Sequence, residues 1–192
     1  MNQDSKVDPS RRLLLSAAAS LGVVAFLPRL LRGAKAATPA LSGNVTIEEY
    51  GADGKSKGTV SVPHVVKTDA EWRAQLSPLA YDVTRHEGTE MAFSGQYDKN
   101  HADGLYACIC CATVLFDSRT KFDSGTGWPS FWRSISRLNV AESGDNSLGM
   151  RRVAVSCKRC EAHLGHVFDD GPRPTGLRYC MNSVALNFTP RA

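Results

Sequence analysis

The spacing of the six cysteines separates two kinds of chemistry that this chain can support. Four of them form two like-spaced pairs, Cys108-x-x-Cys111 and Cys157-x-x-Cys160. Two-residue spacing lets both thiolates of a tight knuckle face one ion, and two knuckles complete a tetrahedral site. We therefore predict one structural zinc ion per chain, because four thiolates leave no open position for water or substrate.

Three other uses of these pairs are open. An oxidising compartment favours disulfides, although a bridge inside a Cys-x-x-Cys motif closes a very short loop and adds little stability. Iron in a rubredoxin-like site takes the same four ligands. A thiol–disulfide oxidoreductase would use one pair as a redox couple, and stoichiometric zinc with four unchanged thiols would exclude that use.

Cys180 stands apart from these pairs, in the alternating segment LRYCMNSVALNF. Strand periodicity puts Arg178, Cys180 and Asn182 on one face, and a cation beside a thiol lowers its pKa. His163 and His166, in HLGHVF, supply imidazoles that can donate a proton near neutral pH. This set favours nucleophilic thiol chemistry; a buried structural cysteine with packing histidines is the alternative.

Aromatic residues in KFDSGTGWPSFW, residues 121–132, are the candidate pocket wall. Trp128 follows a glycine-rich turn, and Phe131 comes three residues later. Aromatics displayed from a loop suit a binding pocket, while a cluster that caps the core is the alternative.

Short strands must position these residues. The ranges 45–50, 60–66, 105–111, 151–157, 163–168 and 182–188 are β-branched or aromatic, partly alternating, and bounded by turn residues. Helix signals lie mainly between residues 68 and 86: Thr68 and Glu71 form a capping box, and Ser77 with Pro78 offers a second helix start. We predict a mainly β fold of antiparallel sheets with short N-terminal helices and a four-cysteine zinc site that joins two knuckles.

The first 36 residues differ in composition from the rest and predict an export signal. Arg11 and Arg12 precede the apolar run Leu13 to Leu27, and Ala34 and Ala36 fit an A-x-A cleavage site. The paired arginines resemble a twin-arginine signal, so we expect an exported, periplasmic protein. This run of fifteen residues is shorter than the roughly 18 to 20 that a membrane-spanning helix needs, so we expect no stable membrane span after the signal is removed. Residues 37–67 then form a linker and N-terminal strands, and 68–190 a catalytic domain.

The net charge argues against a nucleic-acid partner. The signal holds six of the 23 lysines and arginines and two of the 19 acidic residues, which leaves 17 of each. The +4 charge therefore belongs to the signal, and the mature domain lacks the cationic field that displaces phosphate counterions.

Several motifs occur together and in order: GTEMAFSGQYD, the first cysteine pair, KFDSGTGWPSFW, the second pair, and HLGHVFDDGPRPTGLRYCMNS. Over residues 68–190 the chain closely resembles the B-type peptide methionine sulfoxide reductases. The resemblance implies antiparallel sheets around a zinc clamp and reduction of the R epimer of methionine sulfoxide, mostly within oxidised proteins.

The resemblance also implies residue roles. Cys180 would attack the sulfoxide sulfur and become a sulfenic acid, while His163 or His166 helps to protonate the oxygen. Trp128 would receive the substrate methyl group, and we place Phe131 and Thr126 in the same substrate-binding region. The remaining matched positions are Arg178 and Asn182, which would tune the thiol and order the pocket, and the zinc ligands Cys108, Cys111, Cys157 and Cys160.

One departure from the family pattern concerns recycling of the thiol. Many members carry a second cysteine where this chain has Thr126, so the usual intramolecular disulfide cannot form there. A thioredoxin-like reductant could attack the sulfenic acid directly, an added thiol could do so, or Cys110 could act as the resolving residue. We favour direct attack, because Cys110 lies inside a zinc knuckle and nothing in the sequence places it near Cys180.

A function from a different class also fits the cysteine pairs. A non-catalytic zinc-ribbon module would bind nucleic acid or protein through its two knuckles. Such a module has no need of Cys180, His163 and His166, and the neutral mature domain does not favour nucleic acid.

Overall fold

The computed structural model describes residues 43–146 and 151–191, which all belong to one contact unit of the chain, Thr38–Ala192. The predicted export signal and its cleavage site lie outside the described residues. Within the described ranges, no helix is long and apolar enough to cross a membrane.

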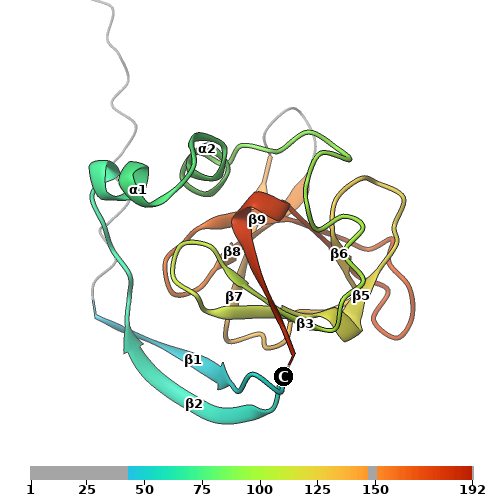
Figure 1. Cartoon of the computed structure of the whole chain (residues 1–192), viewed down its shortest axis with the longest axis horizontal. Helices are drawn as coiled ribbons and strands as arrows, with labels where there is room; N and C mark the ends of the chain where they lie inside the picture. Colours follow the sequence, from blue (N-terminus) through green and yellow to red (C-terminus); the bar gives the residue numbers. More distant parts are fainter. Residues whose placement is uncertain (1–42, 147–150, 192) are drawn as a thin grey trace, which may run out of the picture. The chain divides into compact units, whose positions relative to one another are not determined.

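The described chain begins with a two-stranded hairpin. β1 (Asn44–Tyr50) pairs antiparallel with β2 (Ser56–Pro63), and both are labelled in Figure 1. Ile47 is buried at 4% exposure. The buried side chain of Asn139 binds both backbone polar groups of Glu48, accepting from its N–H at 2.8 Å and donating to its carbonyl at 2.9 Å. These bonds fasten the hairpin to the rest of the domain.

Two short helices follow, as the capping signals predict (Figure 1). α1 (Asp69–Gln75) begins with a complete capping box between Thr68 and Glu71. α2 (Pro78–His86) begins with Ser77 as its N-cap and a proline in the first turn. Their buried residues include Trp72, Ala80, Tyr81 and Val83.

Antiparallel sheets make up the rest. The six-stranded sheet has the order β5-β6-β10-β9-β8-β7, and the three-stranded sheet has the order β11-β3-β4. Their strands are β3 (Gly104–Cys108), β4 (Val114–Asp117), β5 (Lys121–Phe122), β6 (Ser130–Phe131), β7 (Val140–Asp145), β8 (Arg152–Cys157), β9 (His163–Phe168), β10 (Arg178–Met181) and β11 (Leu186–Pro190). Two 3₁₀ turns, η1 (Ser118–Thr120) and η3 (Ser183–Ala185), complete the described elements. The predicted mainly β fold is confirmed.

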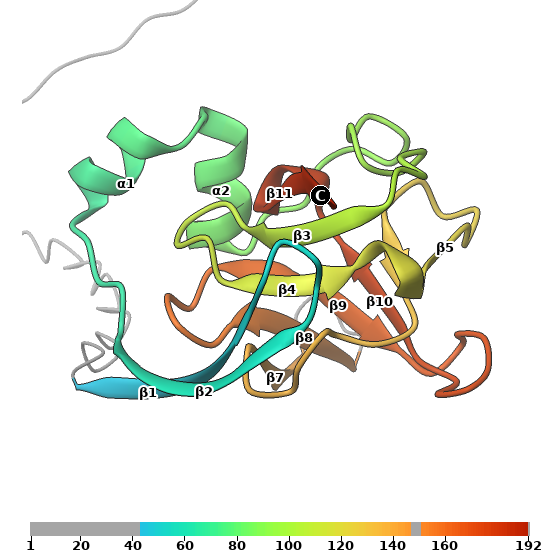
Figure 2. The same cartoon turned by 60° about the horizontal axis from the view of Figure 1, so that its bottom comes forward.

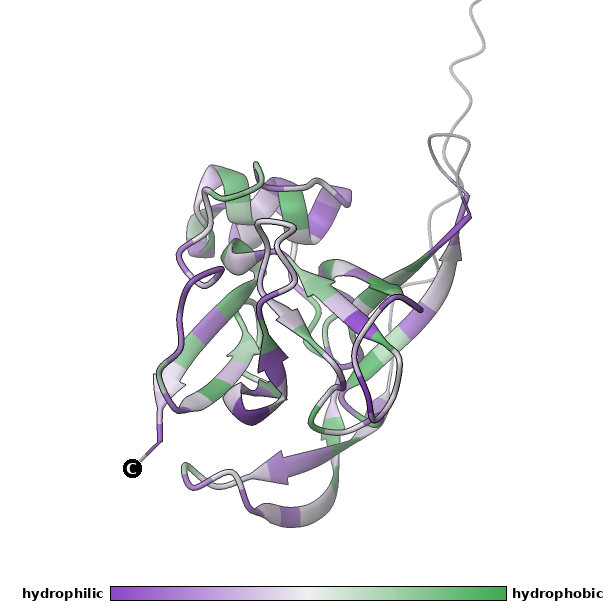
Figure 3. Cartoon of the chain, turned by 90° about the vertical axis from the view of Figure 1, so that its right-hand side faces the viewer, coloured by the Kyte–Doolittle hydropathy of each residue, from purple (hydrophilic) through white to green (hydrophobic). Residues whose placement is uncertain are grey.

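Aromatic side chains fill the space between the two sheets, which face each other in Figure 2. The ring of Phe116 on β4 stacks on Phe131 of β6, with centroids 4.5 Å apart, and lies 5.8 Å from Tyr179 of β10. Tyr106 of β3 meets Phe131 edge-on at 5.0 Å. Apolar and polar positions alternate along several strands in Figure 3, as half-buried strands require.

Two predicted strands are shorter than expected. The segment 105–111 leaves the sheet at Cys108, where the first knuckle begins, and the segment 182–188 starts with η3, so its strand begins only at Leu186. In both segments the regular strand gives way to a turn at a site residue. The first turn carries the metal ligands Cys108 and Cys111, and the second begins at Asn182.

Candidate active site and metal centre

The two Cys-x-x-Cys turns have the same backbone structure. The N–H of Ala112 donates to the carbonyl of Cys108, and the N–H of Glu161 donates to that of Cys157, each at 2.8 Å. Ala112 and Glu161 both have positive φ values, 60° and 55°. A left-handed residue directly after each pair therefore closes each knuckle in the same way.

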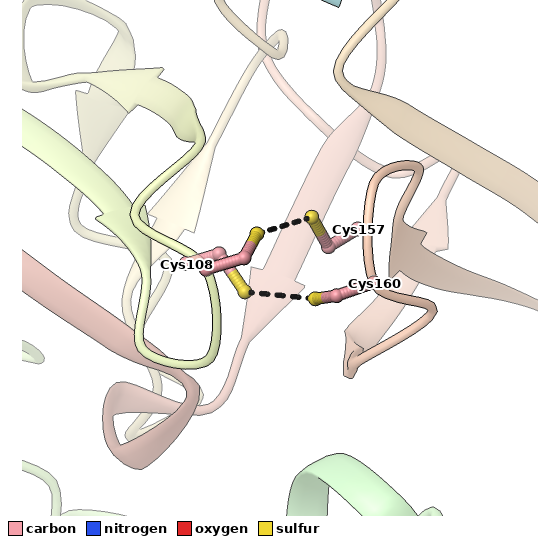
Figure 4. A group of neighbouring side chains, drawn as sticks. Cys108, Cys157 and Cys160 are labelled. Atoms are coloured by element: carbon pink, nitrogen blue, oxygen red, sulfur yellow. Dashed lines mark hydrogen bonds between the residues drawn. The ribbon is translucent and has the colours of Figure 1, made fainter. Parts of the chain in front are cut away.

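The knuckles bring four sulfur atoms together (Figure 4). All four Sγ atoms lie within 4.8 Å of one another, with Cys108 and Cys160 at 3.6 Å and Cys111 and Cys157 at 3.5 Å. These separations are far longer than a disulfide bond of about 2.05 Å. A tetrahedral ion with bonds of about 2.3 Å requires sulfurs about 3.8 Å apart, so the donor set fits zinc and could hold one ion.

This metal centre joins the two sheets. Cys108 is the last residue of β3 in the three-stranded sheet, and Cys157 is the last residue of β8 in the six-stranded sheet. A bound ion would therefore link elements about 50 residues apart in sequence.

Removal of one metal ligand is expected to destabilise the domain. Cys111→Ser should lower the free energy of unfolding by on the order of 4 kcal/mol, a fall in Tm of roughly 10 °C. Thermal unfolding and metal content per chain measure the two effects. Cys110→Ala, in the same knuckle but outside the ligand set, is the control, and an equal loss of stability in both variants would contradict a structural metal.

Cys180 lies in the middle of the six-stranded sheet, on β10. Its direct register partners are Ser130 on β6 and His166 on β9. Residues directly opposite each other on neighbouring strands share a face, so the thiol, the hydroxyl and the imidazole point to the same side. That side holds a pocket of about 120 Å³, whose lining includes Cys180, Thr89, Trp128, His166, Phe168 and Asn182.

Two opposing effects act on the Cys180 thiol. Burial raises its pKa above the ordinary value, and the hydroxyl of Thr126 and the charge of Arg178 pull it down. The Thr126 Oγ1 lies 3.9 Å from the Cys180 Sγ. The Arg178 guanidinium is already engaged by both carboxylate oxygens of Asp170, each at 2.8 Å. The predicted cation is thus present, but burial outweighs its effect on the pKa.

The two histidines have different surroundings. His166 lines the pocket, and its Nε2 lies 2.8 Å from an oxygen of Asp145, which must accept its hydrogen bond. Asp145 also pairs with Arg152 at 2.8 Å. His163 is 5% exposed, and its Nε2 has no hydrogen-bond partner among the described residues. Burial, assisted by His166, lowers the pKa of His163 to about 4.

A network of hydrogen bonds orders two further residues of the pocket lining, Trp128 and Asn182. The indole N–H of Trp128 donates to the backbone carbonyl of Glu90 at 3.1 Å, and the N–H of Glu90 donates to the Asn182 side chain at 2.9 Å. The buried Glu90 carboxylate accepts from the N–H groups of Ser183 and Val184, at 2.6 and 3.0 Å. Trp128 and Asn182 are therefore held through one residue, which is not among those predicted from the sequence.

Comparisons with known proteins agree with this geometry. The SelR domain family matches residues 76–190. A peptide methionine sulfoxide reductase MsrB of Herminiimonas arsenicoxydans is 58% identical over 124 residues, covering 65% of this chain and 90% of the relative. The protein of the same name from Pseudomonas entomophila is 58% identical over 125 residues, covering 65% and 95%. The chain belongs to the MsrB family.

This MsrB-family chain is a peptide methionine sulfoxide reductase, and oxidised methionine is its substrate. The prediction of an enzyme is thereby confirmed over the non-catalytic zinc ribbon. A metal centre compatible with zinc lies beside the pocket's sheet, and the pocket itself contains a thiol, an imidazole and an indole, the groups expected for sulfoxide reduction.

The two predicted substrate-binding residues Thr126 and Phe131 have different surroundings in this MsrB-family domain. The hydroxyl of Thr126 is close to the Cys180 sulfur, and it forms a hydrogen bond of 2.9 Å with the hydroxyl of Ser124. Phe131 is fully buried between Phe116 and Tyr106, and is not among the residues that line the pocket. For Phe131 the core-packing alternative therefore fits better than a pocket wall.

The sixth cysteine, Cys110, is 5% exposed and is not among the residues that line the pocket. Its neighbours include the hydroxyl of Thr84 on α2 and the sulfurs of Cys108 and Cys160. Its backbone carbonyl accepts from the side chain of Gln75 at 3.0 Å. Cys110 therefore belongs to the packing between the helices and the knuckles.

Three acidic residues that organise the site were not predicted from the sequence. Glu90 and Asp170 stand inside quoted motifs, GTEMAFSGQYD and HLGHVFDDGP, and their buried or paired carboxylates become apparent only from the fold. Asp145 lies at the end of β7, outside every motif, so no local signal identified it.

Proposed function

We propose that this enzyme reduces the R epimer of methionine sulfoxide within peptides and proteins, with Cys180 as its nucleophile. The observation that carries the proposal is the shared face of Cys180 and His166 in a pocket lined by Trp128. A thiol and a proton donor on one face of the sheet, with an apolar indole in the same pocket, suit a substrate with a polar S–O bond beside a methyl group.

The reaction transfers one oxygen atom and two electrons. The Cys180 thiolate attacks the sulfoxide sulfur, and His166 donates a proton to the oxygen as the S–O bond weakens. Methionine leaves with its sulfur reduced by two electrons, and the oxygen ends on Cys180 as a sulfenic acid. The low pKa of His163, about 4, leaves that ring neutral at pH 7 and favours His166 as the acid.

Several residues would assist without reacting. Asp145 accepts from His166 and would fix the tautomer and orientation of its ring. Trp128 would receive the substrate methyl group, and Asn182 would hold the pocket wall through Glu90. Arg178 would favour the thiolate, since its charge opposes the effect of burial on the Cys180 pKa.

We further propose that a thioredoxin-like dithiol regenerates Cys180 by direct attack on the sulfenic acid. The dithiol is oxidised to a disulfide, and the oxygen leaves as water. Two features support this route: Thr126 occupies the position beside Cys180, at 3.9 Å, and the spare thiol of Cys110 is buried against α2.

Mass spectrometry after one equivalent of R-sulfoxide tests both steps. In the presence of a sulfenic-acid trap such as dimedone, we expect a single adduct on Cys180. A disulfide between Cys110 and Cys180 would contradict direct recycling while leaving Cys180 as the nucleophile. An adduct on any other cysteine would contradict the nucleophile itself.

Residues 1–36 would direct the enzyme through a twin-arginine route to the periplasm, with the zinc loaded before export. The support is in the sequence alone, from Arg11, Arg12 and the apolar run after them. Lysine at both arginine positions should leave the enzyme in the cytoplasmic fraction of the cell, and unchanged export would contradict this route.

A further inference from the structure

Two large apolar side chains stand exposed on the loop that contributes Thr89 to the pocket. Met91 and Phe93 are 77% and 66% exposed, the highest values among the large hydrophobic residues that the structure describes. Their loop also forms the pocket: Thr89 lines it, and the carbonyl of Glu90 holds the Trp128 indole. Single exposed hydrophobic residues are common, but two on a loop that forms part of a substrate pocket indicate a contact surface.

Phe93 is held in its exposed position by the backbone. It has a positive φ of 64°, an unfavourable conformation for an aromatic residue, and its N–H donates to the carbonyl of Gly127 at 2.8 Å. A Cβ at Gly127 would lie 2.6 Å from the Phe93 nitrogen and 2.8 Å from its ring. The ring therefore lies against the turn that carries Trp128, and strain of this kind is found at functional sites.

We propose that Met91 and Phe93 form an apolar rim that binds an apolar side chain of the substrate polypeptide, two residues from the methionine sulfoxide. In an extended chain, side chains two positions apart point to the same side. When the sulfoxide enters the pocket, the side chain two positions away therefore faces the enzyme. Phe93 is connected to the pocket through Gly127, which accepts its N–H and directly precedes the pocket residue Trp128.

The inference rests on the proposed function and gives it a substrate preference. Oxidised methionines with apolar neighbours two positions away would be reduced faster than those in polar segments. Such sequences are exposed mainly in unfolded or loosened proteins, since native folds bury them.

The experiment compares two peptides that each carry one methionine-R-sulfoxide and differ only in having phenylalanine or serine two positions to either side. With dithiothreitol as reductant, kcat/KM for each peptide and for N-acetylmethionine sulfoxide follows from methionine formation. We expect the wild-type enzyme to prefer the phenylalanine peptide by about tenfold. Phe93→Asn should reduce that preference to about twofold or less, because asparagine tolerates the positive φ but lacks the ring.

Leu79→Ala is the matched control, because Leu79 is 46% exposed on α2 and is not among the residues that line the pocket. It should keep the wild-type preference. Equal kcat/KM for both peptides in the wild type, or an unchanged preference in both Phe93→Asn and Met91→Ala, would overturn the rim. A rim-dependent dimer in sedimentation experiments would assign the surface to a second copy and also overturn it. Failure of the wild type to reduce any R-sulfoxide would instead contradict the proposed function.

Discussion

Cys180→Ser is expected to lower the rate of sulfoxide reduction by on the order of a thousandfold or more. A serine hydroxyl is a far weaker nucleophile, and it cannot form the sulfenic acid that the proposed reaction leaves on residue 180. The change is nearly isosteric on β10, between Ser130 and His166, so the sheet should be undisturbed. Methionine formation from a peptide R-sulfoxide measures the loss.

Metal content and Tm serve as controls for this variant. The four ligand cysteines lie at the ends of β3 and β8 and in the turns after them, whereas Cys180 is in β10, so metal content should equal that of the wild type. Cys110→Ala should keep activity if the reductant attacks directly. Substantial turnover by Cys180→Ser would end the assignment of the nucleophile.

Local signals in the sequence identify the helices and the knuckles. The capping box at Thr68 and the Ser77-Pro78 start each depend on residues within one turn, so the sequence specifies both helices. The paired cysteines likewise specify two equal turns. β5 and β6 contain two residues each, and β7 contains serine and glycine, so neither pattern nor propensity distinguished these strands from loops.

The relation between the histidines depends on tertiary structure. Three-residue spacing along a regular strand puts side chains on opposite faces. The pairing of β8 with β9 is irregular, since Val155 faces Gly165 and Ser156 faces His163, which leaves Leu164 as an extra residue. The bulge brings the ring centroids of His163 and His166 to 5.3 Å from each other. His166 lines the pocket, whereas His163 is buried. Sequence alone therefore could not choose between them.

His166→Asn is expected to lower kcat/KM by on the order of a hundredfold or more, because the sulfoxide oxygen loses its proton donor. Asp145→Asn should cause a smaller loss, since the ring remains but loses the carboxylate that orients it. His163→Asn should mainly lower stability, because the ring is buried and is neutral at pH 7 with a pKa of about 4. An activity loss in His163→Asn that equals that of His166→Asn would contradict this assignment.

The pH dependence of kcat/KM reports on the Cys180 thiol. Reaction needs the thiolate, and burial raises the pKa of the thiol, so the rate should increase with pH up to values above the ordinary thiol range. The same rise should remain in His166→Asn, at a lower rate throughout, because that variant keeps the thiol and its neighbours Thr126 and Arg178. A rate that is already constant below the ordinary thiol range would contradict this effect of burial.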